Sequence, residues 1–349
     1  MHSLDSLDPL VAPVDPVVAL TRIAWLLERT RESTYRVEAF RRAAVAAAGI
    51  DGLSHAARTG GLTNVRGIGN TTAAVITQAV NGAVPDYLAS LQSAHTELTD
   101  DAAALFDALR GDLHAHTNWS DGGAPLSEMA DAAQAFGQDW LAITDHSPRL
   151  TVANGLSAER LEQQIADIDT INTTRSDGLR ILSGIEVDIL DDGSLDQSEE
   201  LLARLDIVTA SVHSKLKMDA APMTARMTAA VSNPRVNVLG HCTGRRVLGG
   251  RGRRAPSEFD ARQVFEACAE HGTAVEINSR PERVDPPDEL IELARDIGCL
   301  FAIDSDAHAP GQLEFKAFGA QRAEQFGIAA NRIVTTWTAD AVIEWAASS

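Results

Sequence analysis

After residue 110, short runs rich in Val, Ile and Leu alternate with stretches of helical periodicity. This alternation is typical of a parallel α/β sheet or barrel, because parallel strands need a crossover connection between them. The runs span residues 139–144, 179–187, 205–211, 236–240, 273–278 and 299–304, and the segment LRGDL (109–113) precedes them. We therefore expect an α/β domain over residues 110–349.

Side chains of the types that bind metal ions stand where these runs end. Since the carboxyl ends of parallel strands open on one face of a (β/α) barrel, we expect them to meet in one pocket. A lone histidine is more often a hydrogen-bonded structural residue, but the repetition favours a shared site over chance. The side chains are His114, His116, His146, Glu186, His213, His241, Asp306 and His308, whereas His2, His55, His95 and His271 lie outside the pattern.

The first hundred residues have a different pattern. Apolar residues recur at helical spacing, as in Leu20, Ile23 and Leu27. The stretch NVRGIGNTTAAVITQAV (64–80) places a Gly-Ile-Gly turn between two helical patterns, and glycine permits a tight reversal that leaves backbone amides exposed. Amides at a helix N-terminus bind phosphate oxygens. We expect a small all-helical domain here.

Composition argues against several classes of protein. No apolar run approaches the roughly 18 residues that span a bilayer, and the first residues lack a signal-peptide pattern, so we expect a cytoplasmic protein without a membrane partner. Cys242, Cys268 and Cys299 are too far apart for a disulfide framework or a thiolate zinc site. The net charge of −19 argues against tight nonspecific binding of nucleic acid, but it leaves room for a local binding module.

Seven motifs resemble those of the PHP (polymerase and histidinol phosphatase) domain family, and most closely the PHP module of bacterial family X DNA polymerases. They read DLHAHTNWSDG, AITDHS, GIEVDILDDGSLD, TASVHS, GHCTGR, VEINSRPER and IDSDAH, and they cover about residues 110–340. The resemblance implies a distorted (β/α)7 TIM-like barrel that holds three divalent metal ions.

The resemblance also implies the ligands of each ion. One metal would bind His114, His116, Glu186 and Asp306, a second would bind Glu186, His213 and His241, and a third would bind Asp121, His146 and His308. Among these we take Glu186, Asp306 and His308 as the catalytic residues.

The ligand types fit this chemistry independently. Imidazole and carboxylate without thiolate suit Zn, Mn or Fe, and ligand type does not choose among them. A carboxylate shared between two metals holds them close enough to deprotonate one bridging water, and the resulting hydroxide can attack a phosphoric ester. No protein nucleophile is required.

Arginines near the motifs are candidates for binding substrate phosphate, because a guanidinium binds phosphate bidentately. We favour Arg245 and Arg280, with surface ion pairing as the alternative for each. The run RRVLGGRGRR (245–254) is the one strongly cationic segment of the sequence. It indicates a polyanionic substrate.

Residues 16–82 resemble the small helical domain that begins family X polymerases, including its helix-hairpin-helix, through YRVEAFRRAA and GGLTNVRGIGNTTAAVI. This resemblance implies that the backbone amides of Gly67, Ile68 and Gly69 dock on a DNA phosphate. Val75 stands where some relatives carry a Schiff-base lysine, so we expect no lyase activity. About 28 residues separate this domain from DLHAHT, too few for a polymerase palm, and Asp167 and Asp169 fit a solvated helix face.

We therefore divide the chain into a flexible N-terminus (1–15), a helix-hairpin-helix DNA-binding domain (16–82), a helical linker (83–109) and a PHP barrel (110–349). The favoured function is hydrolysis of phosphodiester bonds in DNA, as a 3'-5' exonuclease or an endonuclease at damaged sites. The alternative is a small-molecule phosphomonoesterase of the histidinol phosphatase type, which acidity and scarce lysine favour. A non-catalytic DNA-binding protein is a third hypothesis, and the complete set of ligand types disfavours it.

Overall fold

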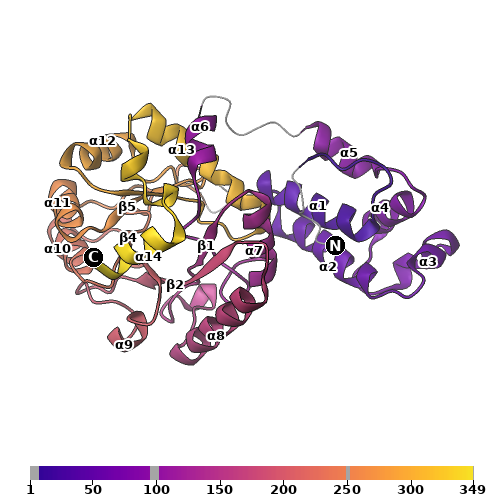
Figure 1. Cartoon of the computed structure of the whole chain (residues 1–349), viewed down its shortest axis with the longest axis horizontal. Helices are drawn as coiled ribbons and strands as arrows, with labels where there is room; N and C mark the ends of the chain where they lie inside the picture. The colour runs from indigo at the N-terminus through magenta and orange to yellow at the C-terminus, as the bar shows by residue number, and fades with distance from the viewer. Residues whose placement is uncertain (1–7, 95–101, 249–251, 349) are drawn as a thin grey trace. The chain divides into compact units, whose positions relative to one another are not determined.

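The computed structural model describes residues 8–94, 102–248 and 252–348. Two compact units divide the chain: Met1–Glu97 with Ala309–Gln312, and Leu98–His308 with Leu313–Ser349 (Figure 1). Parts of the predicted N-terminal extension (1–15) and linker (83–109) lie outside the described residues, and so do His2 and His95.

The first unit is helical, as its apolar spacing predicts. Asp15 begins the first helix, since its side chain accepts hydrogen bonds from the amides of Val17 and Val18. The spaced apolar residues Leu20, Ile23 and Leu27 are buried. The helices are α1 (Pro16–Arg29), α2 (Thr34–Ala48), α3 (Leu53–Thr59), α4 (Asn70–Val80) and α5 (Asp86–Ser93).

The second unit is an α/β fold built on a parallel sheet in the order β1 to β6. All six runs predicted as strands contain one: β1 (Trp140–Ile143), β2 (Arg180–Asp188), β3 (Ile207–Ser211), β4 (Val238–Leu239), β5 (Ala274–Asn278) and β6 (Phe301–Asp304). The helices lie around the curled sheet (Figure 1). They are α6 (Ala103–Ala108), α7 (Leu126–Ala135), α8 (Ala158–Thr174), α9 (Glu199–Leu202), α10 (Ala220–Val231), α11 (Ala261–His271), α12 (Asp288–Ile297), α13 (Lys316–Gln325) and α14 (Ala339–Ser348).

The segment predicted as the first strand, LRGDL, is not a regular strand, but it lies between the two ends of the sheet. The amide of Ala142 in β1 donates to the carbonyl of Asp112, and the amide of His116 donates to the carbonyl of Ala307 beyond β6. Side chains replace backbone partners elsewhere, as where the amide of Leu113 donates to Asp304 Oδ1. Residues 110–116 therefore bring the first and last strands together as an irregular seventh strand.

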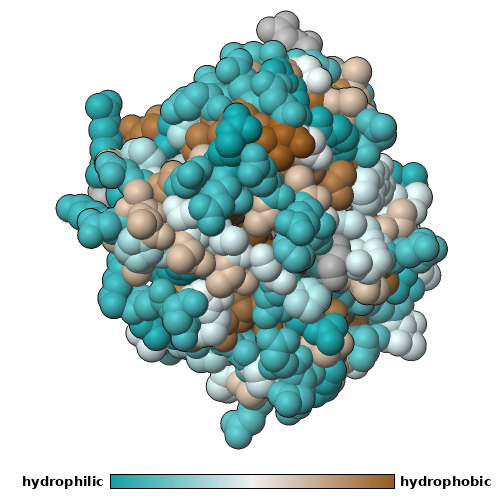
Figure 2. All heavy atoms as spheres, turned by 90° about the vertical axis from the view of Figure 1, so that its left-hand side faces the viewer, coloured by the Kyte–Doolittle hydropathy of each residue, from teal (hydrophilic) through white to brown (hydrophobic). Residues whose placement is uncertain are grey.

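Two apolar clusters hold the barrel. One fills the space between the strands and the outer helices and includes Phe265 and Phe301. The other gathers Trp140 with Trp337 and Trp345, which come from β1 and the C-terminal segment. The face over α10, α11 and α12 is mostly hydrophilic (Figure 2). Among the described residues, we find no helix with the length and apolarity needed to cross a membrane.

Candidate metal centre

Glu186 lies near the carboxyl end of β2, and imidazoles surround its carboxylate. Its Oε2 atom is 2.8 Å from His146 Nδ1, 3.2 Å from His114 Nε2 and 3.5 Å from His116 Nε2. Its Oε1 atom is 2.9 Å from His241 Nε2 and 3.2 Å from His213 Nε2. Each oxygen thus faces its own group of histidines, as expected of a carboxylate that two metal ions share.

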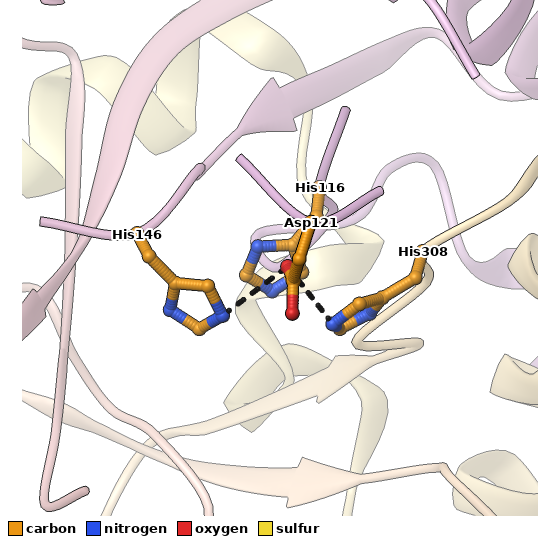
Figure 3. Close-up of side chains that lie close together, drawn as sticks. All are labelled: His116, Asp121, His146 and His308. Carbon is orange, nitrogen blue, oxygen red and sulfur yellow. Dashed lines mark ion pairs between the residues drawn. The ribbon is translucent and has the colours of Figure 1, made fainter. Parts of the chain in front are cut away.

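A second group of ligand-type side chains lies around Asp121, in the loop after His116. Asp121 Oδ1 is 3.5 Å from His146 Nε2 and 3.4 Å from His308 Nε2. The rings of His116, His146 and His308 surround this carboxylate (Figure 3). The Asp121 and His308 side chains are 31% and 24% exposed, so this group is open to solvent.

Asp306 completes the cluster from the loop after β6. Its Oδ1 atom is 3.5 Å from His116 Nε2, and its backbone φ of 50° lies in the left-handed region, which is strained for a residue with a side chain. Such strain often accompanies a functional position. The structure thus brings all nine predicted metal ligands together.

The distances between donor atoms group the candidate ligands somewhat differently from the three predicted metal sites. Ligand atoms within 4.8 Å of one another form four overlapping sets, and His116 joins the Asp121 set while His241 joins His114 and Asp306. The sets are His116–Asp121–His146–His308, His114–His241–Asp306, His114–His116–Glu186 and His146–Glu186–His213. Because the sets share members, the nine side chains form one continuous cluster.

The donor atoms fit metal ions better than they fit one another. Within the described part of the chain, both oxygens of Glu186 are buried without a hydrogen-bond partner, and so are His114 Nε2 and both ring nitrogens of His116, His213 and His241. Leaving so many polar atoms buried and unsatisfied costs free energy unless a ligand satisfies them. Hard-to-intermediate divalent cations match this set of nitrogen and oxygen donors.

The pKa values of the clustered side chains fall into two groups. Burial opposes ionisation of Glu186, but the neighbouring imidazoles hold the pKa of that carboxyl well below its usual range. Burial, together with nearby positive groups, lowers the pKa of His116 and of His241 to about 3. An ionised carboxylate and neutral imidazoles are the forms that bind metal. His114 and His213 differ: although burial works against both, Glu186 and other carboxylates raise the pKa of His114 well above its usual range and that of His213 to about 9.

Glu276 on β5 supports the cluster, and sequence reasoning did not single it out. Its Oε1 atom is 2.6 Å from His114 Nδ1, and Oε2 accepts a hydrogen bond from the amide of His241. A carboxylate on the far nitrogen of a metal-binding histidine orients the ring and leaves the other nitrogen for the metal. Asn278 extends the support, because its Nδ2 donates to both Glu276 Oε2 and Asp306 Oδ2. The one sign of these residues in the sequence was the alternation of Glu276 and Asn278 with apolar residues in VEIN (275–278), which places both on one face of a strand.

Two other buried aspartates hold loops that carry candidate ligands. Asp145 accepts hydrogen bonds from Thr117, Ser120 and Gln164, and so fastens the loop that bears Asp121. Asp285 accepts from the amide and hydroxyl of Thr243, just after His241. Neither role was predicted from the sequence, because each aspartate contacts residues that are far from it along the chain.

The arginines predicted to bind phosphate both contact protein groups. Arg245 Nε donates to the carbonyl of Val284 over 2.9 Å, so its guanidinium turns to the neighbouring loop. Arg280 Nη1 donates to the carbonyl of Asp306 over 2.9 Å and lies 2.8 Å from His308 Nδ1, at the edge of the cluster. Phosphate binding by these two residues stays a prediction.

Arg283, which sequence reasoning did not single out, contacts the cluster directly. Its Nε donates to Asp306 Oδ2 over 3.0 Å, and its side chain is 12% exposed. The Nη1 atom is buried and has no hydrogen-bond partner within residues 8–94, 102–248 and 252–348. An unsatisfied guanidinium nitrogen beside the candidate ligands can donate to a substrate oxygen.

The Gly-Ile-Gly turn of the first unit has fewer free amides than predicted. The amide of Ile68 donates to the carbonyl of Val65, and the amide of Gly69 donates to Thr72 Oγ1. Gly67 has a φ of 97°, a conformation that favours glycine. DNA docking by these three residues stays a prediction, and two of the three amides already have a hydrogen-bond partner within the turn.

The PHP domain matches residues 112–280 of this chain. A DNA polymerase/3'-5' exonuclease PolX of Bacillus subtilis is 43% identical over 200 residues, which cover 57% of this chain and 34% of that protein. The chain therefore spans about a third of the length of this relative.

Shorter relatives and solved structures also match. A histidinol phosphate phosphatase from Lactococcus lactis, solved with zinc, L-histidinol and phosphate, aligns with a TM-score of 0.45 and 16% identity, over 63% of this chain and 95% of that one. A probable phosphatase of Thermoanaerobacter sp. is 30% identical over 213 residues, 56% of this chain and 78% of that protein. This coverage, together with the domain match, shows that the chain belongs to the PHP domain family.

Proposed function

We propose that this protein hydrolyses phosphodiester bonds in DNA as a 3'-5' exonuclease, with three divalent metal ions held by the nine clustered side chains. The observation that carries the proposal is the Glu186 carboxylate, whose two buried oxygens face separate groups of histidines and lack hydrogen-bond partners among the described residues. A carboxylate so placed is suited to bridge two metal ions.

Part of this function follows from family membership. As a PHP domain protein the chain is a metal-dependent hydrolase of phosphoric esters. When bound, the metal ions supply Lewis acidity at the phosphoryl oxygens and lower the pKa of water. The identity of the ions stays open among Zn, Mn and Fe, because imidazole and carboxylate bind all three.

The chain's own residues hold and orient the reactants. Glu276 and Asn278 keep His114 and Asp306 in place, so little reorganisation is needed when substrate binds. Arg283 holds Asp306 through its Nε, and the open group around Asp121 and His308 faces the solvent from which substrate arrives. Burial of the Glu186 side excludes bulk water there.

Similarity supports DNA as the substrate. The identity to the exonuclease-containing Bacillus protein is 43%, against 27–30% for the probable phosphatases. We propose that the helical unit binds DNA through the surface near Gly67 and Gly69.

A phosphomonoesterase is the second candidate. The probable phosphatases match over 73–89% of their own length, which is far more than the Bacillus protein does. A compact monoester also suits an acidic protein better than a long polyanion does.

A direct experiment separates the two. Manganese-loaded protein is incubated with a 5'-labelled single-stranded oligonucleotide and, in parallel, with p-nitrophenyl phosphate. We expect a ladder of shortened oligonucleotides, and no ladder from the Asp306→Asn, His308→Ala double variant. An intact oligonucleotide beside rapid release of nitrophenol would replace the nuclease by the phosphatase. No hydrolysis of either substrate with any of the three metals would overturn both.

A further inference from the structure

The described parts of the cationic run, residues 245–248 and 252–254, pair with each other near the candidate metal centre. Arg246 and Arg254 exchange both backbone hydrogen bonds, 2.9 Å each, and so form an antiparallel bridge. The amide of Val247 donates to the carbonyl of Glu282 over 2.8 Å. The described part of this arginine hairpin, residues 244–248 and 252–254, is thus fastened to the loop that carries Arg280 and Arg283.

The base of the arginine hairpin starts close to the candidate ligands. His241 precedes it by three residues, and Asp285 fastens Thr243 at its base. Arg283, on the neighbouring loop, contacts the ligand Asp306. Arg254 and Arg283 lie near enough to influence each other electrostatically, so the arginine hairpin places positive charge beside the loop that contacts Asp306.

Two arginines of the arginine hairpin, Arg253 and Arg254, form no ion pair with any carboxylate among the described residues. Burial lowers the pKa of Arg254, and the nearby guanidiniums of Arg283 and Arg246 lower it further, while Asp285 opposes them. Arg254 Nε donates only to the carbonyl of Gly244, which carries no charge. Arg253 is exposed, and it forms no hydrogen bond or ion pair with any part of the chain that the structure describes. Gathering like charges is unfavourable unless an anion binds them.

The chemistry of a DNA strand fits this arrangement. A phosphodiester at the metal centre has further phosphates on either side, and guanidinium groups bind each of them. A single phosphomonoester would reach Arg283 but has no further phosphates for Arg253 and Arg254. Since the ligands around Glu186 are buried, one strand enters more easily than a duplex.

We propose that Arg253 and Arg254, on the arginine hairpin, bind the backbone phosphates of single-stranded DNA next to the phosphate that is cleaved. The inference rests on the proposed nuclease function and names the surface that selects a polyanionic strand over a monoester. Contact with the phosphates is independent of base sequence.

The test uses the full chain with both arginines replaced, Arg253→Gln and Arg254→Gln. Arg180→Gln is the matched control, because Arg180 is an exposed arginine at the opposite end of the barrel, where β2 begins. Binding of a fluorescein-labelled oligothymidylate without metal is measured by anisotropy between about 50 and 400 mM salt. Hydrolysis of the oligonucleotide and of p-nitrophenyl phosphate is measured with manganese.

We expect the double variant to bind the oligonucleotide about tenfold more weakly at low salt. Its plot of log Kd against log salt should be shallower by about 0.7 for each lost phosphate contact. The ratio of oligonucleotide to p-nitrophenyl phosphate hydrolysis should fall to a similar extent, and the Arg180→Gln protein should match the wild type.

An unchanged salt slope and an unchanged ratio of rates would overturn the inference while leaving the nuclease intact. Failure of the wild type to cleave the oligonucleotide would instead refute the proposed function. A general loss of binding in the Arg180→Gln control as well would show that net charge, rather than the arginine hairpin, determines affinity, and would also reject the inference.

Discussion

The two sides of the candidate metal centre differ in how the chain builds them. Glu186 stands on a strand, is 1% exposed and faces five histidines. Asp121 stands on a loop, is 31% exposed, and relies on Asp145 to hold that loop. The comparison shows that the half of the site around Glu186 is buried and built on the sheet. The half around Asp121 is built on a loop and is open to solvent. We expect substitutions in the strand-borne half to have the larger effects.

The largest effect is expected from Glu186→Gln. An amide cannot bridge two cations as a carboxylate does, so hydrolysis of every substrate should fall at least about a thousandfold. Circular dichroism should show an intact fold, since Gln has nearly the same volume. Activity above a tenth of the wild-type rate would mean that Glu186 does not join the metals.

A smaller loss is expected from Asp121→Asn on the open half. We expect about a hundredfold slower hydrolysis and the loss of about one bound metal per chain, because the Glu186 half stays complete. Metal content by mass spectrometry and the rate on p-nitrophenyl phosphate measure both. A loss as large as that of Glu186→Gln would break the distinction between the two halves.

Glu276→Gln tests whether the strand-borne half depends on a residue that binds no metal itself. An amide cannot accept the hydrogen bonds from both His114 and the amide of His241, so metal affinity should fall about 10- to 100-fold. Titration with Co²⁺, followed by visible absorption, gives the affinity, and excess metal should restore activity. Glu266→Gln, at an exposed position on α11, is the control. Equal metal affinities of the Glu276→Gln and Glu266→Gln proteins would contradict the role assigned to Glu276.

Gly69→Val extends the comparison to the helical unit. A Cβ at Gly69 meets nothing within 4 Å, and its φ of −99° suits any residue, so this variant should fold. We expect oligonucleotide binding to weaken about fivefold, because a bulky side chain blocks phosphate approach to the turn. Gly67→Val should instead lower the midpoint of thermal unfolding, since its φ of 97° is strained for valine. Unchanged DNA binding by the Gly69 variant would remove the turn from the interface.

The smallest effect is expected from chemical modification of the cysteine thiols, which belong to neither half of the candidate metal centre. Cys242, Cys268 and Cys299 are buried, and burial raises the pKa of Cys299 to about 12. The thiolate, the reactive form, is therefore scarce at pH 8 in the folded protein. Iodoacetamide should label none of them until the protein unfolds, and activity should be insensitive to the reagent. Rapid labelling with loss of metal would place a thiol in the site.

Some features were predictable because they depend on short stretches. Alternating apolar runs and helical stretches predict strands and helices locally, and all six runs after residue 130 contain a strand. Ligand-type residues at the ends of those runs meet because parallel strands open on one face. Even the solvated face of α8, with Asp167 and Asp169, follows from helical periodicity.

Other features depended on contacts between distant residues. The segment LRGDL (109–113) was predicted as a strand, yet the amide of Leu113 donates to the side chain of Asp304 instead of to a backbone partner, and the segment is irregular. The contact between Glu276 and His114 joins positions 162 apart. The contact of the Arg245 guanidinium with the carbonyl of Val284, 39 positions away, was not predictable either, and phosphate binding by Arg245 stays a prediction.

By itself, the sequence determined which ligand atoms the protein has and that parallel strands bring them to one face. The tertiary structure decided which nitrogen faces which oxygen, which arginine keeps a free N–H, and which half of the site is open to solvent. The physical reason is that strand and helix patterns depend on near neighbours, whereas hydrogen bonds between buried side chains depend on the packing of the whole barrel.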